Sequence, residues 1–295
     1  NGTTGLVGNA SVTLTWDTVP TGIQTHTNGT ITVPAGTPSG IYTLTYHICE
    51  NLNSSNCSAA TVTIAVGVSL IVAHKDEGAS FSIPNGANGG TTSSVLANDT
   101  LNGNANPSTS SVTLTWTNVP TGIQTNTDGT ITAPTGTPAG TYTLTYRICE
   151  QLNGTNCSAA TVTLVVGQAS LTAAADTFTV TNGANGGTTS SVLENDSYNG
   201  TTGLAGNASV TLTWTNVPTG IQTHTDGRIT IPAGTRSGTY EVGYKLCENL
   251  NNNHCAVATA TIVVGQAPLQ ATDNDYVISN GANGGTTSSV LENDS

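Results

Sequence analysis

The stretch that decides the fold is residues 140–167, GTYTLTYRICEQLNGTNCSAATVTLVVG. Apolar residues alternate with polar ones along its first half, so that Tyr142, Leu144 and Tyr146 share one face of an extended chain. The second half repeats this alternation up to Val166. A period of two residues is typical of half-buried β-strands, and β-branched and aromatic residues favour them. The stretch therefore predicts the two strands of a β-hairpin.

The same pattern occurs three times. Trp16, Trp116 and Trp214 each end the sequence SVTLTW and recur about 100 residues apart, which is the length of an ordinary domain rather than of a solenoid coil. Each unit contains about seven short predicted strands, with turn residues about every 8–12 positions and no helical period. We therefore expect an all-β chain of tandem immunoglobulin-like, seven-stranded β-sandwiches.

The units are offset from the ends of the sequence. Residues 1–67 match the last five strands of a unit, 68–167 and 168–265 are complete units, and 266–295 match the first two strands of a further unit. We expect this last segment to complete a neighbouring partial unit. Either the sequence is a window from a longer polypeptide, or separate chains complete each other by strand addition. Both alternatives join copies head to tail without closing, which makes a filament.

Six cysteines fall into three pairs of identical spacing: Cys49/Cys57, Cys149/Cys157 and Cys247/Cys255. Two thiols per unit, with no companion CxxC or paired histidine, fall short of the four ligands of a structural zinc site. A disulfide in each unit is favoured instead, on the outer face of the last hairpin. Disulfides indicate a location outside the reducing cytosol.

The composition excludes several classes of partner. Charged residues make up 7% of the chain, against a usual share of about 25%. A net charge of −12 with five basic residues argues against nucleic acid, which needs clustered Lys and Arg. No apolar run approaches the roughly 18 residues of a membrane span. Solubility must come from Thr, Ser, Asn and Gly, or from groups attached to them.

The sequences GTYTLTYRICEQLNGTNCSAATVTLVV (140–166) and SVLANDTLNG (94–103) resemble the tandem immunoglobulin-like repeats of giant surface adhesins in gliding Bacteroidota and related bacteria. The resemblance extends over every unit of the chain. It implies export to the bacterial cell surface, a role in adhesion or in extracellular fibres, and no enzymatic activity.

Two kinds of motif could carry covalent glycans. Thr18 and Thr100 lie in Asp-Thr-aliphatic sequences, which look like the O-glycosylation signal of Bacteroidota. Asn-x-Ser/Thr sequences begin at Asn53, Asn56, Asn98, Asn153, Asn156 and Asn195, among others. Many such matches arise by chance in a chain rich in Asn, Ser and Thr. The idea is motivated by the scarcity of charge, because a sugar coat would replace charge as the solvating layer.

Acidic residues recur near the joints between units. Asp99 and Asp196 each follow an asparagine, and Asp176 and Asp275 lie in linkers. These four are the candidate calcium ligands. Calcium takes about six to eight oxygen atoms, several from carboxylates, and each joint offers too few acids. Caps in which Asn and Asp accept hydrogen bonds from backbone amides explain the pattern better. We therefore expect no cofactor.

Nothing in the sequence indicates catalysis. His26 and His224 occupy equivalent positions, but Asn126 stands there in the middle unit, as at an ordinary polar surface position. We expect a structural subunit or segment of an extracellular filament or adhesin stalk, whose main partners are copies of itself. The alternative is a module that itself binds a glycan or a surface. Such lectin-like sites usually expose aromatic residues, and here most aromatic residues fall on the buried face.

Overall fold

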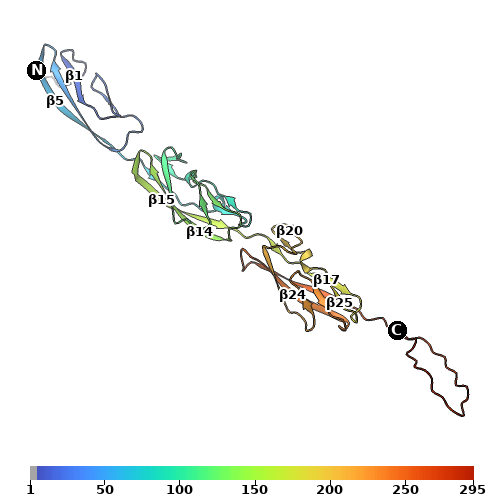
Figure 1. Ribbon diagram of the computed structural model, residues 1–295. Helices are drawn as coiled ribbons and strands as arrows, with labels where there is room; N and C mark the ends of the chain where they lie inside the picture. The colour runs from blue at the N-terminus through green and yellow to red at the C-terminus, as the bar shows by residue number, and fades with distance from the viewer. Residues whose placement is uncertain (1–4) are drawn as a thin grey trace. The chain divides into compact units, whose positions relative to one another are not determined.

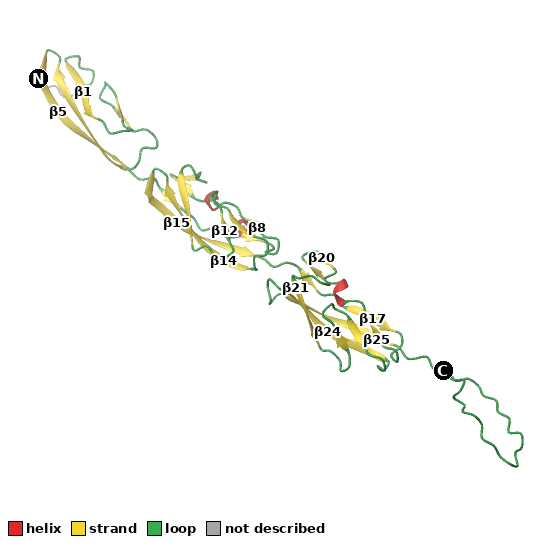
Figure 2. Ribbon diagram, in the orientation of Figure 1, coloured by secondary structure: helices red, strands yellow, loops and turns green. Residues whose placement is uncertain are grey.

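The computed structural model describes residues 5–295 (Figure 1). The chain forms two compact units, Asn1–Gly167 and Gln168–Ser295. Both are all-β, with a few single 3-10 turns between strands (Figure 2). The first contains two β-sandwich repeats in tandem, and the second contains one repeat followed by residues 266–295. No helix among residues 5–295 has the length and apolar character that crossing a membrane requires.

The main sheet of the second repeat is built around the predicted hairpin, in the order β11-β14-β15-β7. Its strands are β11 (Val112–Thr117), β14 (Gly140–Glu150), β15 (Asn153–Val166) and β7 (Ser82–Ile83). Neighbouring strands are antiparallel, except that β7 runs parallel to β15. The alternation of the sequence buries Leu144, Tyr146 and Ile148 completely, so the inner face of this sheet is the main wall of the core.

The other wall of this core consists of shorter pieces. One sheet has the order β12-β13-β8 and another the order β10-β9-β6. Their bounds are Gln124–Thr125 (β12), Ile131–Ala133 (β13), Gly90–Thr91 (β8), Asn104–Ala105 (β10), Thr100–Leu101 (β9) and Ile71–Val72 (β6), and the 3-10 turns are Ala79–Phe81 (η1) and Val95–Ala97 (η2). Residues 68–167, all of them described, thus hold ten strand segments rather than about seven. The reason is that Gly-, Asn- and Pro-rich turns interrupt the first half of the repeat.

The third repeat has the same architecture. Its sheets have the orders β17-β25-β24-β21, β18-β23-β22 and β16-β19-β20. The bounds are Leu171–Thr172 (β16), Asp176–Val180 (β17), Gly187–Thr188 (β18), Val192–Glu194 (η3), Ser197–Tyr198 (β19), Thr201–Thr202 (β20), Val210–Thr215 (β21), Gln222–Thr223 (β22), Ile229–Ile231 (β23), Gly238–Glu248 (β24) and Cys255–Val264 (β25). Here too the strand from the first half of the repeat, β17, runs parallel to β25.

The first repeat is incomplete within residues 5–67. Its strands are β1 (Val12–Thr18), β2 (Gln24–Thr25), β3 (Ile31–Thr32), β4 (Gly40–Glu50) and β5 (Asn53–Val66). They form the sheets β1-β4-β5 and β2-β3, which lack the parallel strand and the third short strand seen in the other repeats. Tyr46 and Ile48 are therefore only half-buried, whereas the equivalent Tyr146 and Ile148 are fully buried.

Residues 266–295 contain no strand, which differs from the two strands that the sequence predicts there. The physical reason is that a strand needs a hydrogen-bonded partner, as β17 has in β25 and β18 in β23. Hydrogen bonds of this segment join its own ends instead, with Gln270 and Ser295 exchanging backbone bonds of 2.6 and 3.0 Å. Its large apolar side chains are exposed: Leu269, Val277, Ile278, Val290 and Leu291.

Candidate functional site

An open groove runs along the inner face of the first repeat. The groove has a volume of about 560 Å³ and lies beside β1, β4 and the turn between β2 and β3. Its lining is largely apolar and includes Leu6, Val7, Val12, Leu14, Gly29, Tyr46 and Ile48. An exposed apolar surface of this kind on a folded domain is typical of a binding surface.

The same position is filled in the second and third repeats. In the second, Val95 donates a backbone hydrogen bond to Gly129 at 3.0 Å, and a Cβ atom added to Gly129 would lie 2.4 Å from Ser94 Oγ. In the third, Val192 donates to Gly227, also at 3.0 Å. A Cβ atom added to the equivalent Gly29 would meet only Leu14 Cδ2, at 3.6 Å, and no residue of a 3-10 turn. The groove is therefore the site that η2 and η3 occupy in the complete repeats.

The residues that fill this site have exposed equivalents near the C-terminus of the sequence. Val192 and Leu193 of η3 are 0% and 4% exposed. Val290 and Leu291, which occupy the same positions in the sequence SVLEND, are 55% and 70% exposed. The chain thus presents an unfilled apolar groove in one unit and an unburied set of matching side chains in the other.

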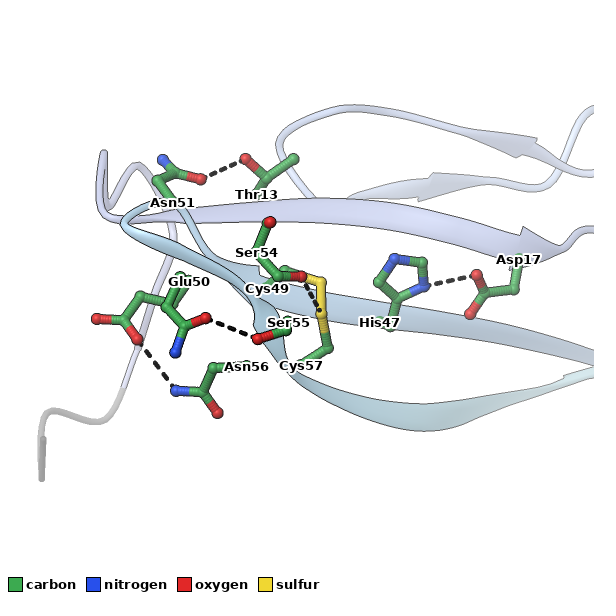
Figure 3. Close-up of a disulfide and its surroundings, with 11 residues drawn as sticks. Thr13, Asp17, His47, Cys49, Glu50, Asn51, Ser54, Ser55, Asn56 and Cys57 are labelled. Atoms are coloured by element: carbon green, nitrogen blue, oxygen red, sulfur yellow. Dashed lines mark hydrogen bonds and ion pairs between the residues drawn. A yellow bond between two sulfur atoms is a disulfide. The ribbon is translucent and has the colours of Figure 1, made fainter.

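Three disulfides link the six cysteines: Cys49–Cys57, Cys149–Cys157 and Cys247–Cys255. Each connects directly paired residues of the last hairpin of its repeat. Figure 3 shows the first of them between β4 and β5, on the same side of the hairpin as the contact of 2.6 Å between His47 Nδ1 and Asp17 Oδ1. Each bridge holds the end of its own hairpin together.

Buried carboxyl pairs lie beside the core tyrosines. Sequence reasoning grouped these acids, including Asp76, as possible calcium ligands at the joints, but it did not find their contacts with the tyrosines. Asp99 is fully buried and accepts hydrogen bonds from the backbone amide of His74 and the hydroxyl of Tyr146, both at 2.8 Å. Asp76, which is 2% exposed, also interacts with this hydroxyl and with the charge of Asp99. The sequence signal that could have indicated this cluster is an Asn-Asp pair that precedes a tyrosine on the buried face of a predicted strand.

The third repeat has the same pair in Asp176 and Asp196. Tyr244 Oη lies 3.1 Å from Asp176 Oδ2, 3.1 Å from Asp196 Oδ1 and 2.7 Å from the carbonyl oxygen of Ala174. A phenol has one proton and cannot donate it to three acceptors. A carboxyl group that holds a proton can donate to the phenol oxygen, which then accepts one bond while it donates another.

Burial supports this protonation. Loss of solvation raises the pKa of Asp76 to about 7, with the neighbouring charge of Asp99 adding to the rise. The same burial raises the pKa of Asp176 to about 6, again with a contribution from its partner Asp196. Two carboxyl groups in one buried site cannot both ionise without a large electrostatic cost.

The candidate calcium ligands are only partly brought together. Asp176 and Asp196 share one cluster, and Asp99 lies in the other, but Asp275 is exposed and Asn274 takes the position equivalent to Asp176. Among residues 5–295, no group of three or more His, Cys, Asp or Glu side chains gathers in the manner of a metal site.

The candidate glycosylation residues differ in accessibility. Five are exposed, namely Thr18, Asn53, Asn56, Asn98 and Asn195, and three are partly buried, namely Thr100, Asn153 and Asn156. Asn156 Nδ2 donates to the carbonyl oxygen of Ser69 at 2.7 Å and to Glu150 Oε2 at 3.0 Å. A glycan attached to that nitrogen would disturb these bonds.

Comparison with known proteins gives no family. No protein-family model matches the chain, and neither does any curated protein sequence. The chain is similar to mouse cadherin-23 EC22–24, with 15% identity, 90% and 89% of the two chains covered and a TM-score of 0.35. It is also similar to mouse clustered PcdhgC3 EC1–3 (12%, 88% and 90%, TM-score 0.35) and Drosophila OTK extracellular domains 3–5 (10%, 88% and 87%, TM-score 0.27). TM-scores this low carry no conclusion about relationship, and the fold rests on the sheets themselves.

Proposed function

We propose that this chain is a structural subunit or segment of an extracellular bacterial filament or adhesin stalk, extended head to tail through its tandem sandwiches. The observation that carries the proposal is the open groove of the first repeat, together with the exposed Val290 and Leu291 that match the side chains filling that site elsewhere. Covalent continuation and strand complementation would both extend the array. Neither requires catalysis or a cofactor.

The joint inside the first unit supports a stalk. Asn153, at the tip of the β14–β15 hairpin, donates a hydrogen bond of 2.6 Å to Ser39 Oγ of the first repeat. Leu152 beside it lies against Gly36. The linker residue Ser69 bonds to Glu150, also near this tip. Contacts on both sides of the linker restrict bending, as a stalk that presents a distal group requires.

The disulfides and the composition support the extracellular part of this proposal. Each hairpin is closed by a covalent bond that a reducing cytosol would not maintain. The outer faces carry mainly threonine, serine and asparagine rather than charge. Covalent glycans on exposed residues such as Asn53 and Thr18 would fit this surface.

Imaging of the native assembly tests the proposed function. Antibodies raised against residues 68–167 should label thin filaments or stalks on intact cells that express the chain, with gold particles at regular intervals. Labelling confined to the cell interior, or to scattered particles without filaments, would contradict it.

A further inference from the structure

We infer that residues 271–295 of one copy of this chain dock into the open face of residues 5–67 of a second copy, in a register set by Gly281 and Gly67. This inference deepens the proposed function and rests on it. It commits to strand complementation between copies, and the two complete repeats supply the pattern of contacts.

The strands absent from the first repeat are those that the C-terminal segment would supply. In the third repeat, β17 pairs in parallel with β25, from Asp176 opposite Ala260 to Val180 opposite Val264. Residues 274–278 are equivalent to β17, and Val62 to Val66 of β5 are equivalent to the paired part of β25. Docking would therefore place Ile278 opposite Val66. Similarly, residues 285–286 would add the third strand beside β3, as β18 does beside β23.

The first of these glycines, Gly281, is equivalent to glycines that make close contacts in the complete repeats. Gly86 and Gly183 donate backbone hydrogen bonds to Gly167 and Gly265 at 2.9 and 3.0 Å. A Cβ atom on Gly86 would lie 2.1 Å from the carbonyl oxygen of Thr137, and one on Gly183 would have an equivalent contact of 2.2 Å. Gly281 is the third member of this set, and among residues 5–295 nothing lies within 4 Å of its added Cβ atom.

The second glycine shows the same contrast on the other side of the interface. A Cβ atom on Gly167 would lie 2.2 Å from the carbonyl oxygen of Pro84, and one on Gly265 would lie 2.3 Å from that of Thr181. Gly67 is the equivalent residue at the end of β5, and its added Cβ atom also meets nothing within 4 Å. Two separate glycines, one at the end of β5 and one in the C-terminal segment, thus match contacts that a completed repeat makes.

The C-terminal segment already has the conformation that docking needs. The backbone amide of Thr272 donates to Asp294 Oδ1 at 2.7 Å, as Ala174 does to Asp196 at 2.8 Å. An added Cβ atom on Gly285 would lie 3.0 Å from Ile278 Cδ1, which repeats the distance between Gly90 and Ile83. A segment that holds its bound shape beforehand loses less conformational entropy on binding.

The polar centre of the docked repeat would differ from the other two in one respect. In the complete repeats, Tyr146 and Tyr244 each lie between two aspartates. Docking would bring Tyr46 to Asn274 and Asp294. An amide donates hydrogen bonds without titrating, so this composite cluster needs no shared proton.

Association of the purified 295-residue chain tests the inference. Sedimentation velocity over a concentration series should show linear oligomers that grow with concentration. Gly281→Ala and Gly67→Ala should each raise the apparent Kd by about 10- to 100-fold, because they overpack a closed interface. Gly154→Ala, at an exposed hairpin tip with open space around it, is the matched control and should behave as the unmodified chain. Equal melting temperatures of all variants would show that folding is intact.

A mixing experiment identifies the partner. Gly67→Ala retains a competent C-terminal segment, and Gly281→Ala retains a competent groove, so an equimolar mixture should form dimers and stop there. Monomers in the mixture, or oligomers of either variant as strong as those of the unmodified chain, would overturn the inference. If the unmodified chain stays monomeric while native filaments are labelled along their length, the inference fails and the proposed function stands with a covalent joint.

Discussion

Tyr244 Oη lies 3.1 Å from Asp176 Oδ2, deep in the third repeat, and the burial of this carboxyl group links folding to pH. The folded state holds a proton on the carboxyl pair more tightly than the unfolded chain does, because burial raises the pKa of Asp176 to about 6 and that of Asp76 to about 7. The usual aspartate value is about 3.9. The resulting stabilisation is complete below about pH 4 and is lost as pH rises through about 6 to 7.

The free energy of unfolding should therefore decrease between about pH 4 and pH 8. Urea titrations of the full chain at a series of pH values, followed by tryptophan fluorescence, measure it. Trp116 and Trp214 pack on Tyr146 and Tyr244 with ring centroids 5.7 and 6.0 Å apart, so they report on the clusters directly. Stability that rises over this range would contradict the shared proton.

Asp176→Asn should flatten the pH dependence of the third repeat. The C-terminal segment already carries Asn274 at the equivalent position, and an amide can donate to Tyr244 without titrating. Calorimetric melting at pH 5 and pH 8 should show a smaller difference for this variant than for the unmodified chain. Asp275→Asn, at an exposed residue, is the control and should leave the difference unchanged. An unchanged slope in Asp176→Asn would place the titrating proton elsewhere.

Removing one disulfide should weaken one repeat without unfolding the chain. In the double variant Cys149→Ala and Cys157→Ala, the unfolded state regains the entropy of a loop of about nine residues, which corresponds to about 2.5 kcal/mol on the chain-entropy model. The β14–β15 ladder and the buried Leu144 and Tyr146 remain. Chemical denaturation should show one destabilised transition of this size. A loss of β-structure at room temperature would mean that the bridge does more than close the hairpin.

Where native chains carry glycans, the modified residues should be exposed ones such as Asn53 and Thr18, and Asn156 should be unmodified. The reason is that both hydrogens of Asn156 Nδ2 are engaged, by Ser69 and Glu150. Peptide mapping by mass spectrometry of material from the cell surface gives the occupancy of each residue. A glycan on Asn156 would show that modification precedes or disrupts these bonds.

The hairpins and the disulfides could be predicted from sequence because they depend on local patterns. Alternation along residues 140–166 assigns each residue to a face, and the spacing of Cys149 and Cys157 fits directly opposed positions in the hairpin. The burial of the carboxyl pairs against the core tyrosines could not be predicted in the same way. Asp76 and Asp99 meet because a parallel strand brings one linker residue beside the core tyrosine, and strand register across a crossover leaves no local signal.

The choice of Asp275 as a candidate ligand shows the same limit. The linker acid lies five residues before Phe81 in the second repeat but only two residues before Phe178 in the third. Counting from this aromatic residue therefore does not show which acid in one linker is equivalent to which acid in another. The contacts made by the turn resolve it. The backbone amide of Thr272 donates to Asp294 as that of Ala174 donates to Asp196. The residue equivalent to Asp176 is therefore Asn274, and not Asp275.

Leucine truncations at two equivalent positions should have opposite consequences. Leu193→Ala removes a side chain that is 4% exposed and should lower the free energy of unfolding of the third repeat by about 2–5 kcal/mol. Leu291→Ala removes one that is 70% exposed and should leave the unfolding of the monomer unchanged. At concentrations where the unmodified chain forms oligomers, however, Leu291→Ala should weaken association, because docking would bury this side chain in the groove beside Tyr46. Denaturation at low concentration and sedimentation at high concentration measure the two effects separately. Monomer destabilisation by Leu291→Ala would mean that residues 271–295 pack within their own chain, and the groove would then need another occupant.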